Sequence, residues 1–160
     1  MQSEAGAVRS RGSDLRLGWQ DHFLETDTEA HAWESLAALL SSGCTDGLVV
    51  DVGLPVTHRG VRFNCRAFLL NRRVLLLRPK LVLADCGNYR EGRWFTAWPG
   101  GRGVESFRLP PCVAAVAGQL TAPLGHAALA FHDVTLATEL CEAREPRWAA
   151  PRRSLARARL

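Results

Sequence analysis

Residues 61–80 read VRFNCRAFLLNRRVLLLRPK and contain two apolar runs, VRFNCRAFLL and RVLLLRP, which Asn71 and Arg72 separate. Two apolar runs of this length with only two residues between them suit two strands joined by a tight connection. The stretch therefore predicts a pair of neighbouring strands, the second of which ends just before Lys80.

The residues before this pair predict a helix and a further strand. HAWESLAALLSSG (residues 31–43) places Trp33, Leu36, Ala37 and Leu40 at helical spacing, and Gly43 follows where a C-terminal cap is expected. GLVVDVGLPV (residues 47–56) is rich in valine and bounded by glycine and proline, which favours a buried strand. We expect this strand to be central in its sheet.

The residues after the pair predict a long irregular stretch and a second pair of strands. Residues 88–111 carry several aromatics, glycines and prolines, a composition typical of ordered loops. HAALAFHDVTLATEL (residues 126–140) predicts two strands that turn near His132 and Asp133. These elements together indicate an α+β domain.

The overall composition limits the classes of function. The net charge of +4 arises because arginines crowd residues 144–159, a tail in which we expect no packed fold. That tail lacks the interleaved aromatics of a nucleic-acid surface, so we expect no nucleic-acid partner. No secretory or membrane-spanning run is present, and no metal-ligand spacing occurs, so we expect a soluble, cytoplasmic protein without a metal.

Two residues at predicted strand ends are candidates for chemistry. Cys141 follows VTLATEL and could present a thiolate to a carboxamide carbon, although an inert core cysteine is the alternative. Lys80 is the only lysine of the chain. It could stabilise the oxyanion of a tetrahedral intermediate or lower a thiol pKa, and a solvated strand end is the alternative.

Two further candidates lie in NYREGRW, which follows the strand pair. Glu91 could orient a lysine or an ammonia leaving group through charge-assisted hydrogen bonds, or it could form an ordinary ion pair of a loop. Tyr89, the only tyrosine, could hold a substrate through its hydroxyl group or could be a packed loop aromatic.

These motifs, read together, resemble the amidase domain of glutamine-dependent NAD synthetases, a branch of the nitrilase-like carbon–nitrogen hydrolases. WQDHFLETDT, the run from DVGLPVTHRG to RPK, NYREGRWFTAW and TELCEA occur in the order of that family. The resemblance implies that residues 18–142 form a partial glutaminase domain with an incomplete α-β-β-α sandwich. Residues 1–17 and 143–160 do not match.

The resemblance also implies the roles of site residues. Cys141 corresponds to the nucleophile, Lys80 to the lysine of the glutamate–lysine–cysteine triad, Glu91 to a supporting glutamate and Tyr89 to a substrate-binding residue. L-glutamine is the implied substrate, and its ammonia amidates deamido-NAD in the whole enzyme, NAD synthase (glutamine-hydrolysing). ATP and Mg²⁺ serve the synthetase domain, so no cofactor is implied for this chain.

One departure from the family concerns the general base. A gapless extension of the match backward places Arg11 where the family has its first glutamate. An arginine cannot accept the thiol proton, so we expect this chain to be an inactive fragment. The alternatives are a non-catalytic module that docks on full-length NAD synthetase subunits, and another amidase of the nitrilase superfamily.

Overall fold

The computed structural model describes residues 24–87, 89–138 and 156–159. These residues form a mixed α and β fold around a five-stranded sheet of strand order β1-β2-β3-β7-β6. Its strands are β1 (Val50–His58), β2 (Val61–Leu70), β3 (Arg73–Pro79), β6 (Glu105–Arg108) and β7 (Thr121–Leu124). Strands β3 and β7 run parallel, and the other neighbours run antiparallel.

The predicted strand pair is confirmed as β2 and β3. Asn71 and Arg72 form the two-residue turn between them, with φ angles of 49° and 62°. Two consecutive positive φ angles match the twist of the flanking strands, which is why such a tight connection forms here. The Asn71 side chain supports the turn, because its Oδ1 accepts a hydrogen bond from the Gly47 N–H at 2.8 Å.

The expectation that the valine-rich strand is central is wrong. That strand is β1, and it lies at one edge of the sheet with β2 as its neighbour. The central position belongs to β3, which is buried from Val74 to Pro79. A strand covered on both faces has a continuous apolar run, and the LLL of β3 fits that description better than β1, whose Gly53 is exposed.

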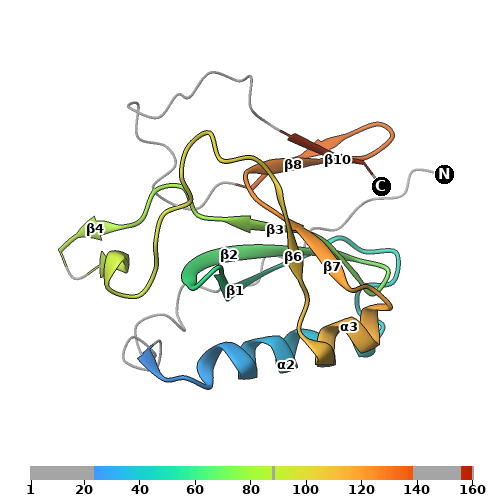
Figure 1. Cartoon of the computed structure of the whole chain (residues 1–160). Coiled ribbons are helices and arrows are strands. Elements are labelled where there is room, and N and C mark those ends of the chain that lie inside the picture. Colours follow the sequence, from blue (N-terminus) through green and yellow to red (C-terminus); the bar gives the residue numbers. More distant parts are fainter. Residues whose placement is uncertain (1–23, 88, 139–155, 160) are drawn as a thin grey trace.

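Two helices cover one face of the sheet (Figure 1). Helix α2 (Thr28–Ser41) buries Trp33, Leu36, Ala37 and Leu40, the four residues that the helical spacing singled out. Helix α3 (Pro111–Ala117) has no counterpart among the predicted elements, although it begins with a proline and ends at Gly118 in the left-handed conformation. The main hydrophobic core lies between this helical layer and the sheet.

A second, three-stranded sheet lies against the opposite face (Figure 1). It consists of β8 (Ala127–Ala130), β9 (Thr135–Leu136) and β10 (Ala156–Arg159) in the order β10-β8-β9. The β8–β9 pair confirms the predicted turn near His132. Strand β10 pairs in parallel with β8, so the expectation of no packed fold in the basic tail is wrong for these four residues.

The stretch between β3 and β6 is mostly irregular, as its composition predicts. It contains a two-residue pair of strands, β4 (Asp85–Cys86) and β5 (Tyr89–Arg90), followed by the 3₁₀ helix η2 (Glu91–Arg93). None of the helices in the described part of the chain is long and apolar enough to cross a membrane.

Candidate functional site

Lys80 lies directly after β3 and is buried, with 2% of its surface exposed. Its N–H donates to the carbonyl oxygen of Asn64 at 2.8 Å, and its own carbonyl oxygen accepts from the Trp98 N–H at 3.0 Å. The backbone of Lys80 is therefore held between β2 and the segment that carries Trp98. The alternative of a solvated strand end is wrong, because the sheet and this segment enclose the side chain.

Glu91 begins η2 and is also buried, with 8% exposed. Its Oε2 accepts from Lys80 Nζ at 2.5 Å and from the Ala84 N–H at 2.8 Å, and its Oε1 accepts from Asn64 Nδ2 at 3.3 Å. A charged lysine and two neutral donors therefore serve one carboxylate. Glu91 forms a buried pair with Lys80, which goes beyond an ordinary ion pair of an exposed loop.

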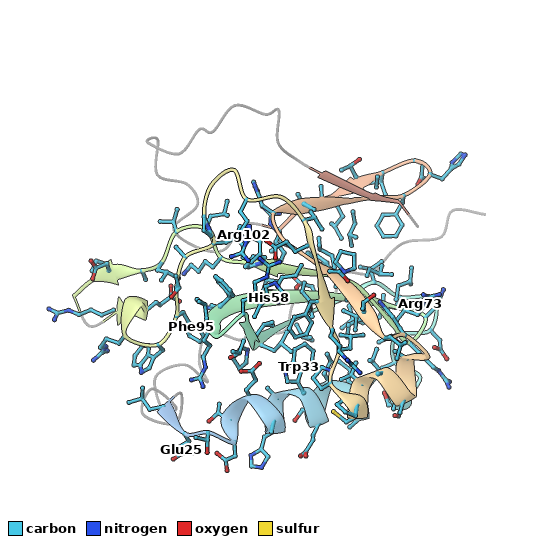
Figure 2. The ribbon with its side chains drawn as sticks, in the orientation of Figure 1. Glu25, Trp33, His58, Arg73, Phe95 and Arg102 are labelled. Carbon is cyan, nitrogen blue, oxygen red and sulfur yellow. The ribbon has the colours of Figure 1, made fainter. Side chains whose placement is uncertain are left out.

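The loop after β3 folds back on itself and thereby brings Glu91 next to Lys80. The β4–β5 pair reverses the chain, so that the Glu91 N–H donates to the carbonyl oxygen of Ala84 at 2.9 Å. The carbonyl oxygen of Glu91 then accepts from the Trp94 and Phe95 N–H groups, and Phe95 (Figure 2) is buried. These backbone bonds fix the start of η2 and therefore the direction of the Glu91 side chain.

The Trp98 segment, which binds the backbone of Lys80, is itself held by aromatic packing. Trp98 is 1% exposed, and its ring meets Phe63 of β2 edge to face with 5.1 Å between centroids. The Arg102 guanidinium lies 4.2 Å from the Trp98 ring centroid, a cation–π contact. Because Trp98 binds the carbonyl oxygen of Lys80, this packing also holds the lysine in place.

The buried pair has a chemical consequence. Moving two charges out of water is costly, and the cost is offset only when opposite charges and further hydrogen bonds compensate both groups. The Lys80 ammonium and the Glu91 carboxylate meet that condition. An ammonium fixed in this manner is a preorganised positive charge, the kind of group that stabilises negative charge developing in a reaction.

The other two predicted site residues are only partly located. Tyr89 lies in β5, two residues before Glu91, so the loop that carries the glutamate also carries the tyrosine. Cys141 lies outside the described residues. The nearest described position is Thr138, whose Oγ1 donates to Asp51 Oδ2 at 3.4 Å.

Asp51 and Asn64 are polar contacts of this region that sequence reasoning missed. Asp51 accepts a hydrogen bond from Arg66 Nε at 2.8 Å, and Arg66 is two residues after Asn64 on β2. Residues two apart on a strand point to the same face of the sheet. The sequence feature that could have indicated these contacts is the alternation of polar residues in an otherwise apolar strand, at Arg62, Asn64 and Arg66.

A separate charged cluster joins the two edges of the large sheet. Glu105 of β6 accepts from Arg102 Nε at 2.6 Å and lies 2.9 Å from His58 Nε2 of β1 (Figure 2). Arg59 adds a further ion pair at 3.2 Å. The hydrogen bonds from Arg102 and then His58 lower the pKa of Glu105 to about 2. We call these four residues the edge clasp.

A cleft lies beside the edge clasp and away from the lysine. It has a volume of about 690 Å³ and lies between α2, the end of β1, β6 and the start of α3. Its lining includes the stacked rings of Trp33 and Phe107, whereas Lys80 and Glu91 do not contribute to it. The cleft and the buried pair are therefore different places on the molecule.

Comparison with known proteins relates this arrangement to a group of enzymes. No family model matches the chain. The glutamine-dependent NAD(+) synthetase of Oryza sativa subsp. indica is 48% identical over 141 residues, which cover 86% of this chain and 19% of that protein. The protein of the same description from Homo sapiens is 44% identical over 145 residues, covering 84% of this chain and 20% of its own length.

A solved structure agrees with the sequence relatives. The crystal structure of a glutamine-dependent NAD(+) synthetase from Cytophaga hutchinsonii matches with a TM-score of 0.66 and 30% identity, over 78% of this chain and 20% of that one. In both sequence and fold, the chain is therefore similar to proteins of the NAD(+) synthetase class. In particular, it is related by descent to one segment of the glutamine-dependent NAD(+) synthetases, and it spans about a fifth of the length of these relatives.

Proposed function

We propose that this chain carries part of the glutamine-hydrolysing site of a glutamine-dependent NAD(+) synthetase, with L-glutamine as the substrate. The observation that carries the proposal is the buried Lys80–Glu91 pair at the end of the central strand, in a chain related to these enzymes. A buried lysine with a fixed carboxylate partner suits the stabilisation of negative charge during attack on a carboxamide.

The proposed reaction begins with Cys141. Its sulfur attacks the carboxamide carbon of glutamine and forms a carbon–sulfur bond, and the negative charge moves to the carbonyl oxygen. The carbon–nitrogen bond then breaks, the nitrogen takes up the proton that the Cys141 thiol has given up, and ammonia leaves behind a thioester. Water hydrolyses the thioester to glutamate and restores the thiol.

The remaining residues serve this reaction in defined ways. Lys80 supplies positive charge near the thiolate and the oxyanion, Glu91 holds the lysine and assists proton transfer, and Tyr89 contacts the glutamine. In the whole relatives, the ammonia would amidate deamido-NAD to NAD. The helical layer, the large sheet and the β8 sheet are, in this proposal, part of an α-β-β-α sandwich of the nitrilase type.

We further propose that the chain binds and traps glutamine analogues but turns glutamine over very slowly. A gapless backward extension of the match places Arg11 where the family has its first glutamate, and an arginine does not accept the thiol proton. Loss of a general base costs about 100-fold to 10,000-fold in rate.

The test uses a diazoketone analogue of glutamine, an electrophile that alkylates a thiol held beside the carboxamide site. Mass spectrometry would report which of the five cysteines is modified. We expect preferential labelling of Cys141, slowed by free L-glutamine and not by free D-glutamine. Exposed Cys44 and Cys86 serve as internal controls for unselective alkylation.

Two results would contradict the proposal. Equal labelling of Cys141 and the exposed cysteines, without protection by L-glutamine, would remove the assignment of a glutamine site. Rapid release of glutamate and ammonia that disappears in Cys141→Ala would support the site and refute the expected slow turnover.

A further inference from the structure

Asn64 connects the two charged residues of the buried pair. Its side-chain Nδ2 donates to Glu91 Oε1 at 3.3 Å, and its main-chain carbonyl oxygen accepts from the Lys80 N–H at 2.8 Å. A carboxylate only accepts hydrogen bonds, so the amide nitrogen of Asn64 is the group that faces Glu91. Asn64 therefore contacts the glutamate through its side chain and the lysine through its backbone.

The two oxygens of Glu91 receive donors from different parts of the fold. Oε2 accepts from Lys80 Nζ and from the Ala84 N–H, which both belong to the loop that follows β3. Oε1 accepts from Asn64, which belongs to β2. Because the bond to Oε1 fixes the plane of the carboxylate, it also fixes the direction in which Oε2 meets the lysine.

We propose that Asn64 is a positioning residue of the glutamine site: its amide orients the Glu91 carboxylate and thereby sets the position of the Lys80 ammonium. The inference rests on the proposed function. Asn64 acts through Glu91 and is not itself a catalytic residue. Its place in the middle of a hydrogen-bonded sheet suits this role, because strands hold side chains more precisely than loops do.

A second contact of β2 supports the assignment. Arg66, on the same face of the strand as Asn64, binds Asp51, and Asp51 accepts from Thr138, three residues before Cys141. One strand thus contacts the lysine–glutamate pair through Asn64 and, through Arg66 and Asp51, the segment that carries Thr138.

The experiment uses the fact that Lys80 is the only lysine. Acetic anhydride would acylate the Lys80 amine only when it leaves Glu91, and mass spectrometry of peptides that contain Lys80 would give the rate. The α-amine of the chain provides an internal reference. We expect Asn64→Leu to raise the acylation rate of Lys80 about tenfold, the size expected for losing a hydrogen bond to a charged group. Asn64→Gln, which keeps an amide donor, should restore most of the protection.

Asn71→Ala is the matched control. Asn71 is also an asparagine next to β2, and it supports the β2–β3 turn through the Gly47 N–H, far along the strand from Lys80. This variant should lower the stability of the fold and leave the acylation rate of Lys80 within about twofold, because Asn71 does not contact the pair. A tenfold rise of the Lys80 acylation rate in this control would show that general loosening of the fold causes the effect. It would overturn the proposal.

A spectroscopic measurement reports on the same contact independently of acylation. A chain labelled with ¹⁵N-lysine gives one side-chain ammonium resonance, so no assignment is needed. The resonance should be observable in the unsubstituted chain and in Asn64→Gln, and it should shift or broaden in Asn64→Leu. The same resonance in all three folded variants would overturn the positioning role.

The trapping experiment separates this inference from the proposed function. In Asn64→Leu we expect alkylation of Cys141 by the glutamine analogue to slow about tenfold, with protection by L-glutamine retained. Absence of protected labelling in the unsubstituted chain would refute the glutamine site itself. Protected labelling that Asn64→Leu leaves unchanged, together with unchanged acylation, would refute only the role of Asn64.

Discussion

Lys80→Met is the substitution that most directly tests how the candidate site is held together. The side chain of Lys80 is 1% exposed and that of Glu91 is 10% exposed, so water does not replace the lost ammonium. Methionine fills most of the volume of the lysine stem but leaves the carboxylate without this charged partner. The Ala84 N–H and the Asn64 amide remain in place as neutral donors.

The expected cost follows from this burial. Breaking a buried ion pair by removing one partner destabilises a protein by about 3–5 kcal/mol, whereas a solvent-exposed pair contributes about 0–1 kcal/mol. The double variant Lys80→Met with Glu91→Leu removes both charges. It should cost about 1–3 kcal/mol, less than the single variant, because neither charge of the pair is left buried without the other.

Urea denaturation followed by circular dichroism would measure these free energies of unfolding. The Arg72–Asp46 pair provides the control, because its side chains are 52% and 51% exposed and its Nη2–Oδ2 distance is 3.0 Å. Asp46→Asn should cost much less than Lys80→Met, because solvent screens an exposed pair.

Two outcomes would refute the reasoning. A loss below about 1 kcal/mol in Lys80→Met would show that the pair behaves like a surface ion pair. A double variant that loses as much as the two single variants summed would show that the two charges do not depend on each other.

Three other predictions concern the rest of the fold. The pKa of Glu105 is lowered to about 2 by its bonds to Arg102 and His58, so its stabilising effect is complete above the ordinary value of 4.5 and is lost as the pH falls toward 2. Urea midpoints of the unsubstituted chain should therefore fall more between pH 4.5 and pH 2 than those of Glu105→Gln. Gly125→Ala should lower the free energy of unfolding by about 1–3 kcal/mol in urea denaturation, because φ is 154° and a Cβ atom would lie 2.9 Å from Val104 Cα. Burial, and then the charge of Glu29, raise the pKa of the Cys65 thiol well above its ordinary value, so iodoacetamide should label Cys65 only after unfolding.

Controls for these three predictions are available in the same chain. Gly100→Ala should be nearly neutral, because no atom lies within 4 Å of the added Cβ. Exposed Cys44 should react with iodoacetamide in the native state. Parallel pH profiles for Glu105→Gln and the unsubstituted chain, an undisturbed Gly125→Ala, or native labelling of Cys65 would each contradict its prediction.

Local patterns in the sequence determined the elements whose formation depends on neighbours a few residues away. The helical spacing of Trp33, Leu36, Ala37 and Leu40 identified the buried face of α2, because side chains three and four apart share a helix face. The two residues between the apolar runs identified the β2–β3 turn, because only tight turns join strands over that length. Sequence also singled out Lys80 and Glu91 as candidates, and NYREGRW as part of the motifs shared with the family.

The tertiary structure alone decided which of these elements meet. The order of strands places β1 at an edge and β3 in the centre, and the parallel pairing of β10 with β8 joins segments that the local pattern treats separately. Spacing along the chain could not show that Glu91 binds Lys80, or that Asn64 completes the contact. These contacts depend on how the loop after β3 folds back on β2, and that path is set by the burial of aromatic and charged groups across the whole domain.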